Sequence, residues 1–292
     1  MSLEARGRDL LTRPDGTAVV LAEASVVIVA PFRDGLLHAI AVEPAVPGIE
    51  TLVGRSAYAG FRRAVDELLP GERASGSVRH QLLDDLSTAL MLSGRVLRAE
   101  GIGFGDRPAG HKPPVDLCAG WIADGVAVAA YSDLGPPLFP APDAPAVAPD
   151  DDPLGWHAHD ALPPHSTRRR RRLDVWPEGD VVKLDSFFRD SHVDRDGRET
   201  VVHEYTVRGT VDASTFEVLS CDAAWGELPF PECPAAVAST SRIVGEPVDG
   251  LRRKVLKTMV GPSTCTHLND QLRSLEDVAP LARALTAAIS PG

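Results

Sequence analysis

The spacing of apolar and polar residues predicts strands in one part of the chain and helices in the next. Runs rich in β-branched and aromatic residues, which are typical of strands, lie at residues 170–175, 181–190, 200–211 and 216–222. Amphipathic stretches, which predict helices, follow at residues 235–241, 250–259, 265–275 and on to residue 289. Because the strands precede the helices, we expect an α+β fold whose antiparallel meander is covered by helices on one face.

The first part of the chain repeats this order of signals. Asp15-Gly16 and Asp196-Gly197 are turn signals that each precede a β-rich run. Further along, Leu52-Val53-Gly54 and Ile243-Val244-Gly245 each precede an amphipathic helix. We therefore predict two tandem pseudo-repeats, each a small antiparallel sheet covered by helices. Chance similarity is the alternative explanation of this pattern.

Composition suggests where the two repeats separate. We predict a degenerate N-terminal repeat at residues 1–134, a linker at residues 135–155, and a C-terminal repeat at residues 156–292. The linker prediction depends on a stretch that is rich in Pro, Ala and Asp. The second repeat also has an insertion at residues 225–239 that the first repeat lacks.

Charge and cysteine content narrow the class of protein. The 292 residues carry 30 basic and 41 acidic side chains, a formal net charge of −11, which disfavours nonspecific binding to nucleic acid or to anionic membranes. The N-terminus is too charged for a signal peptide, and no apolar stretch is long enough to cross a bilayer. Four cysteines in a chain of this length do not form a disulfide framework, so we expect a cytoplasmic protein with reduced thiols.

Two cysteines of the second repeat stand at predicted helix starts. Cys233 precedes Pro234, which suits a first helical turn, and Cys265 follows the helix-start sequence Gly261-Pro262-Ser263-Thr264. The helix dipole and free amide groups at such positions favour thiolate over thiol. A thiolate serves both nucleophilic catalysis and metal ligation, and His267 lies two residues beyond Cys265 as a base or ligand. The alternative is that His267 caps the helix or fills the core.

Further candidates lie on the predicted strands. His203 and Glu204 point to opposite sides of their strand, and we expect His203 to face the site. Asp190 and His192 would share a strand face, where a carboxylate could orient an imidazole, although a structural turn role for Asp190 is equally compatible. We expect Cys118 and Cys221 to be small buried hydrophobic residues.

A run of five arginines at residues 168–172 has two interpretations. It is either a solvated strand end or, at Arg168, a clamp for a carboxylate or phosphate, because the guanidinium fork matches such anions. The cluster of His157, His159 and Asp160 resembles metal ligands but lies just after the linker, so we expect a loop there. Dinucleotide and phosphate-binding loops, the Gly-x-Ser-x-Gly elbow and Cys-x-x-Cys pairs are absent from the sequence.

Two blocks of the second repeat resemble a bacterial family. Pro229-Phe230-Pro231-Glu232-Cys233-Pro234 and Cys265-Thr266-His267-Leu268, together with the residues already named, look like the domain of unknown function DUF2889 over residues 160–290. His192 stands where that family usually has Lys, and Thr264 where it usually has Gly, so a role of that Lys would be altered here. The family implies no reaction. The order of strands and cysteine-opened helices also resembles the iron–sulfur scaffold (NifU/SufE-like) fold, without its signature motifs.

These features favour a small-molecule enzyme with a thiolate or metal site in the C-terminal repeat. Cys265, His267, His203 and Asp190 are the predicted catalytic residues, and Arg168 and Phe230 the predicted substrate-binding residues. The metal-ligand prediction consists of Cys233, Cys265 and His267, with zinc or iron as the metals that mixed sulfur and nitrogen ligands prefer. The predicted substrate is small and acyl, or acidic through a carboxylate or phosphate.

Two other classes stay open on the sequence alone. One is a scaffold or carrier that holds metal or sulfur without turnover, and the other is a structural pseudo-dimer with inert cysteines. We expect no nucleic acid or membrane partner. A fused pair of repeats often replaces a homodimer, so we expect a monomer.

Overall fold

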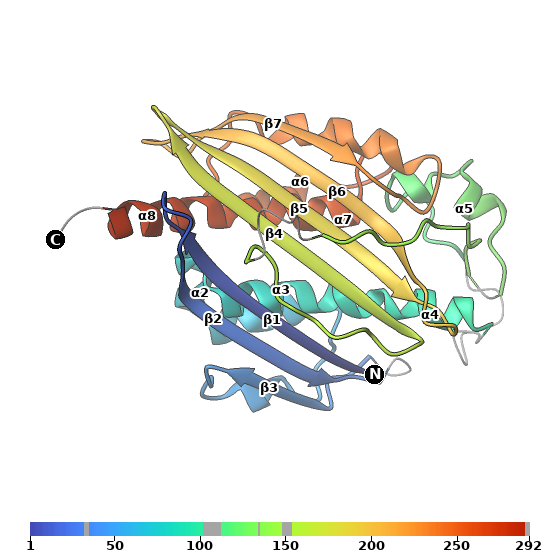
Figure 1. Cartoon of the computed structure of the whole chain (residues 1–292). Coiled ribbons are helices and arrows are strands. Elements are labelled where there is room, and N and C mark those ends of the chain that lie inside the picture. Colours follow the sequence, from blue (N-terminus) through green and yellow to red (C-terminus); the bar gives the residue numbers. More distant parts are fainter. Residues whose placement is uncertain (32–34, 102–111, 134, 148–153, 290–292) are drawn as a thin grey trace. The chain divides into compact units, whose positions relative to one another are not determined.

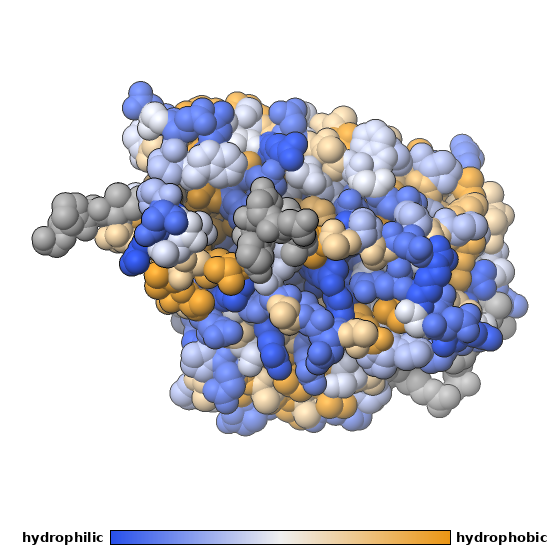
Figure 2. Space-filling view, viewed as in Figure 1, coloured by the Kyte–Doolittle hydropathy of each residue, from blue (hydrophilic) through white to orange (hydrophobic). Residues whose placement is uncertain are grey.

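The chain folds into two compact units in the computed structural model, which describes residues 1–31, 35–101, 112–133, 135–147 and 154–289. The first unit comprises residues 1–93 with a short piece at 154–155, and the second comprises residues 94–147 and 156–289. Both units combine antiparallel strands with helices, so the α+β prediction is confirmed. Hydrophilic and hydrophobic side chains are interspersed on the face seen in Figure 2.

A four-stranded meander forms the sheet of the second unit. Its strands are β4 (Ser166–Glu178), β5 (Val181–Val193), β6 (Glu199–Asp212) and β7 (Val218–Trp225), in the order of the sequence and all antiparallel. The β5–β6 turn contains Gly197 at φ 82°, a conformation that glycine adopts without strain. β4 begins earlier than expected, because the arginines at its start are held by partners on both faces and give no apolar signal.

Helices cover one face of this sheet, as Figure 1 shows for α6, α7 and α8. The helical elements are the 3-10 helix η3 (Cys233–Ile243), α6 (Leu251–Thr258), α7 (Thr266–Ser274), the short η4 (Leu275–Asp277) and α8 (Val278–Ile289). Leu268 and Leu272 of α7 are completely buried against Phe188 and Tyr205 of the sheet, within one apolar core. Each such leucine contributes about 1.5–3 kcal/mol relative to an exposed one, which fixes α7 against the strands.

The described residues between 94 and 147 belong to the second unit, although the predicted boundaries place all of them in the first repeat and the linker. They contain α4 (Ser93–Ala99), the 3-10 helix η2 (Ala119–Trp121) and α5 (Val126–Ala129). The Ala119 amide donates to the Thr264 carbonyl at 2.8 Å, and Asp143 forms an isolated bridge with Thr200 of β6. The compact units and the predicted repeats therefore divide the chain at different residues, and the predicted repeat boundaries stay a prediction.

The first unit contains a smaller sheet of three antiparallel strands. These are β1 (Ser2–Thr12), β2 (Ala18–Val29) and β3 (Ala39–Glu43), followed by η1 (Ile49–Leu52), α1 (Phe61–Leu68), α2 (Pro70–Ser75) and α3 (Val78–Met91). The hydroxyl of Ser77 caps α3 by accepting from the His80 amide at 3.1 Å. His80 Nε2 lies 2.9 Å from Asp66 Oδ1, so within the first unit it makes a local hydrogen-bond contact.

The two units share several local features. The register shifts at Asp9 in the β1–β2 pair and at Asp190 in the β5–β6 pair. Gly60 before α1 and Gly250 before α6 both adopt positive φ, at 77° and 86°. These features are what the predicted repeat requires, while β4 is an additional strand of the second unit. The duplication itself stays a prediction.

Within the described residues, no helix combines the length and apolar character needed to cross a membrane.

Candidate functional site

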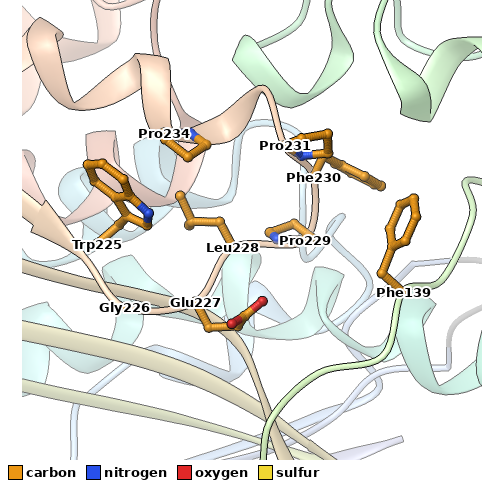
Figure 3. Close-up of a pocket in the computed structure, with 9 residues that line it drawn as sticks. All are labelled: Phe139, Trp225, Gly226, Glu227, Leu228, Pro229, Phe230, Pro231 and Pro234. Carbon is orange, nitrogen blue, oxygen red and sulfur yellow. The ribbon is translucent and has the colours of Figure 1, made fainter.

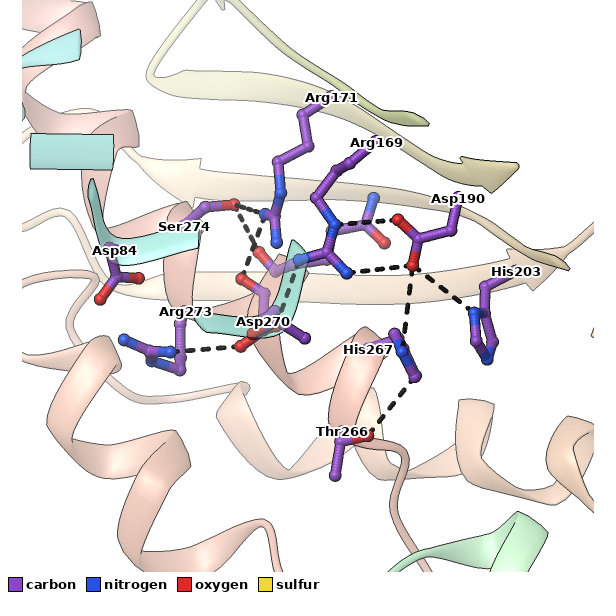
Figure 4. A network of polar contacts seen from close by, with 12 residues as sticks. Asp84, Arg169, Arg171, Asp190, His203, Thr266, His267, Asp270, Arg273 and Ser274 are labelled. Atoms are coloured by element: carbon purple, nitrogen blue, oxygen red, sulfur yellow. Dashed lines mark hydrogen bonds and ion pairs between the residues drawn. The ribbon is translucent and has the colours of Figure 1, made fainter. Parts of the chain in front are cut away.

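A buried carboxylate stands at the centre of the site in the second unit. Asp190 of β5 is 0% exposed and lies opposite Arg169 of β4 in the strand register. Arg169 donates from Nε to Oδ1 at 2.8 Å and from Nη2 to Oδ2 at 3.0 Å (Figure 4). Burial alone would raise the pKa of Asp190, but the Arg169 guanidinium and the neighbouring His203 hold that pKa well below its ordinary value. Asp190 is therefore ionised and fixed in position.

Two histidines contact the same oxygen of this carboxylate. His203 of β6 is the strand neighbour of Asp190, with Nδ1 3.5 Å from Oδ2. His267 of α7 approaches from the helix layer, with Nε2 3.9 Å from Oδ2. The imidazole rings stack with their centroids 3.6 Å apart and their planes at 22°. Burial lowers the pKa of His203, which favours the neutral form of this ring.

Cys265 faces the other nitrogen of His267. It is the N-cap residue of α7, is 4% exposed, and has its Sγ 4.0 Å from His267 Nδ1. Burial would raise the pKa of the Cys265 thiol, yet His267 and the Tyr205 hydroxyl outweigh burial and lower the pKa below its ordinary value. The start of α7 adds to this effect, because the Leu268 amide also stabilises the thiolate.

Two further thiols lie near Cys265, and their pKa values are shifted in the opposite direction. Cys233 at the start of η3 is 5% exposed, and Cys118 before η2 is 8% exposed. Burial, together with the neighbouring Cys265, raises the pKa of Cys118 to about 11 and that of Cys233 to about 12. A β-carbon added to Gly120 would lie 2.8 Å from Cys233 Sγ, which places the loop after Cys118 against that sulfur. Of these three thiols, Cys265 is therefore the one whose thiolate form is favoured.

The remaining predicted residues lie outside this centre. Arg168 points to the opposite face of β4 from Arg169, donates to the Asp160 carbonyl at 3.0 Å and pairs with Glu199 at 3.6 Å. Phe230 packs edge-on against Trp121, with ring centroids 6.1 Å apart.

Three other side chains singled out from the sequence are also engaged elsewhere. Glu204 pairs with Arg189, on the face of β6 opposite His203. His192 is buried, and its pKa is lowered by burial and then by Arg95. Cys221 lies in the apolar core.

Among the residues that the structure describes, one group of potential metal ligands converges: Asp190, His203 and His267, whose ligand atoms lie within 4.8 Å of one another. The predicted set of Cys233, Cys265 and His267 is not gathered in this way. Two histidines and a carboxylate can hold iron or zinc. Arg169, however, already binds both oxygens of Asp190, and its charge would stand beside a divalent cation. These residues therefore fit a metal poorly.

Sequence reasoning missed three residues of the site. Arg169 was hidden in the arginine run, although strand alternation relative to Arg168 separates the two faces. Tyr205 lies two residues after His203 on β6, so both side chains point to the same face, and strand alternation could also have identified Tyr205. Nothing local identifies Cys118, because its neighbourhood to Cys265 depends on a contact between distant parts of the chain.

Comparison with known proteins identifies one family. Residues 167–280, less than half of the chain, match the model of the family described as "Protein of unknown function (DUF2889)". The predicted resemblance to this family is thus confirmed over that segment. No curated protein matches, and no solved structure matches. The resemblance to the iron–sulfur scaffold fold receives no support from these comparisons.

Proposed function

We propose that this chain, whose residues 167–280 belong to a family of unknown function, is a cysteine-dependent enzyme that acts on acyl substrates. One observation carries the proposal: His267 lies between the Cys265 sulfur, 4.0 Å from Nδ1, and the Asp190 carboxylate, 3.9 Å from Nε2. A nucleophile, a base and a group that orients the base form the arrangement used for nucleophilic catalysis. The first distance is at the long limit for a hydrogen bond to sulfur and the second exceeds a hydrogen bond, and such contacts commonly shorten when substrate binds.

The proposed reaction begins at the Cys265 thiolate. Its sulfur attacks the carbonyl carbon of the substrate and forms a tetrahedral oxyanion. The oxyanion collapses to a thioester on Cys265 while the His267 imidazolium gives its proton to the leaving group. Neutral His267 then takes a proton from water or from a second acceptor, which attacks the thioester and releases the acyl group. Asp190 orients His267 and stabilises the imidazolium, and Arg169 keeps Asp190 in place.

The structure favours the acyl part of the predicted substrate over the acidic part. Arg168, the predicted anion clamp, binds Asp160 and Glu199, and Arg169 binds Asp190. The proposal otherwise keeps a small-molecule substrate, a monomer, and no nucleic acid or membrane partner. A cytoplasmic location fits a thiolate enzyme, and all four cysteines are free.

Alkylation with iodoacetamide tests the proposal without knowledge of the substrate. We expect peptide mapping to find Cys265 labelled first, and its labelling to persist below the ordinary thiol pKa of about 8.5. His267→Ala should slow this labelling at pH 6 about tenfold, because the thiolate loses its stabilising cation. Cys221→Ser, which removes a core thiol, is the matched control and should leave the rate at Cys265 unchanged.

An acyl probe then tests turnover. We expect p-nitrophenyl acetate to give a burst of p-nitrophenol equivalent to one acyl group per chain, and Cys265→Ser to abolish it. Equal labelling of Cys265 and Cys221 would contradict the proposal in favour of inert cysteines. Stoichiometric zinc or iron in the purified protein, lost on Asp190→Asn, would contradict it in favour of the metal-binding alternative.

A further inference from the structure

A groove lies between the end of β7 and the start of η3, in the second unit. It has a volume of ≈ 250 Å³ and is formed almost entirely by residues of the predicted insertion at 225–239. Figure 3 shows its lining residues, which are Phe139, Trp225, Gly226, Glu227, Leu228, Pro229, Phe230, Pro231 and Pro234. The groove is separate from the charged centre at Asp190, and none of the proposed catalytic residues lines it.

The walls of the groove are aromatic and partly open to solvent. Trp225 is 49% exposed and Phe139 is 44% exposed, although both are large apolar side chains. Phe230 is held edge-on between Phe139, with ring centroids 6.3 Å apart, and Trp121. The π faces of such rings carry partial negative charge and attract cations, most strongly at Trp.

Glu227 is the one charged side chain that lines the groove. Among the described residues it has no ion-pair partner, and in Figure 3 its carboxylate points toward the space between Leu228 and Phe139. The backbone of Glu227 is held to β6, because the Glu227 carbonyl accepts from the Glu204 amide at 2.8 Å. An unpaired carboxylate beside aromatic faces is complementary to a ligand that is both cationic and apolar.

We propose that this groove binds the alkylammonium group of a small cationic ligand. Trp225 and Phe139 supply aromatic faces, Leu228 supplies an apolar wall, and Glu227 supplies the counter-charge. The net charge of −11 concentrates cations near the surface at low ionic strength. The ligand class is distinct from anything required by the chemistry at Cys265, and the two proposals stand independently.

Calorimetric titration of the full chain with choline tests the proposal. The neutral isostere 3,3-dimethylbutan-1-ol, in which carbon replaces the ammonium nitrogen, is the matched ligand. We expect choline to bind at least fivefold more tightly than the isostere at low salt. Glu227→Gln and Trp225→Leu should each weaken choline binding about fivefold. Glu227→Gln should leave binding of the isostere unchanged, because only the charge is removed.

Two variants separate this result from indirect effects. Trp176→Leu removes an equally exposed tryptophan of β4 outside the groove, and Cys265→Ser removes the proposed nucleophile, and both should keep the affinity for choline. If Trp225→Leu loses its fold, Trp225→Phe retains an aromatic face and should keep most of the binding. Equal affinities for choline and the isostere, or choline binding that survives both groove substitutions, would overturn the proposal.

Discussion

Arg169 stabilises the buried negative charge of Asp190. Asp190 is 0% exposed, and an unpaired carboxylate at such a position costs much free energy. Without a partner, either the carboxylate would be protonated or the protein would unfold. Arg169 binds both of its oxygens and also contacts Asp270 at 3.7 Å. The histidines depend on this pair, because the oxygen they share is the one that Arg169 Nη2 holds.

Arg169→Gln should therefore destabilise the protein. We expect a loss of about 3–5 kcal/mol in the free energy of unfolding, because Asp190 stays buried without its counter-charge. Urea unfolding at pH 7 measures the loss. Arg168→Gln, one residue earlier on the opposite face, should cost less than about 1 kcal/mol. Equal losses in the two variants would contradict the assigned role of Arg169.

The buried hydroxyl of Tyr205 is one of the groups that lower the pKa of the Cys265 thiol. Tyr205→Phe should raise the pKa of Cys265, because one of the groups that favour the thiolate is removed. The rate of iodoacetamide labelling at pH 6 should fall severalfold, with little change at pH 10, where the thiol is ionised in both proteins. Tyr131→Phe is the control and should show the wild-type pH profile. A parallel fall at both pH values would indicate altered access instead.

At the scale of elements, periodicity accounts for most of the second unit. The strands predicted at residues 181–190 and 200–211 agree with β5 and β6 within three residues, because alternating apolar positions face one core. Periodicity does not predict the start of β4, because arginines with partners on both faces stand there in place of alternating apolar residues. Periodicity also fails for residues 94–147, whose contacts with the rest of the unit do not form a periodic face. They include the Ala119–Thr264 hydrogen bond and the packing of Trp121 and Phe139 against Phe230.

The β6–β7 pair contains a glycine that its partner strand requires. A β-carbon on Gly209 would lie 2.5 Å from the Ser220 carbonyl oxygen, which belongs to the backbone and cannot rotate away. Gly209→Ala should therefore reduce the free energy of unfolding by about 1–3 kcal/mol. Thermal unfolding measures this. Gly71→Ala, in α2 with open space around it, is the matched control and should be neutral or slightly stabilising. Equal effects would contradict the clash.

At the scale of the whole molecule, the site draws on parts of the chain that the family match leaves out. Ala119 and Gly120 precede the matched segment, yet within the second unit Ala119 bonds to Thr264 and Gly120 lies against Cys233. The candidate site was predictable to the extent that Cys265, His267, His203 and Asp190 all belong to one unit. Its arrangement was not, because the thiols and their neighbours meet only through contacts between distant residues.

Gly120→Ala tests how firmly the early segment is attached. The new β-carbon would lie 2.8 Å from Cys233 Sγ and 3.0 Å from the Phe230 ring, so we expect the loop to be displaced. Limited proteolysis should then cleave residues 112–147 faster than in the wild type, while β4 to β7 stay protected. Gly197→Ala is the control. It introduces backbone strain in the β5–β6 turn without a clash against the early segment, whereas a β-carbon on Gly125 would itself clash. Unchanged cleavage would contradict the close packing.

The hydrogen bond between Ala119 and Thr264 has a consequence for the order in which the protein matures. It joins stretches that are far apart along the chain, so the loop it closes is entropically costly and such contacts form late in folding. Cys265 likewise meets Tyr205 only once α7 has docked on β6. In the unfolded chain we therefore expect Cys265 to be an ordinary thiol, and we expect its pKa to fall only when these long-range contacts close.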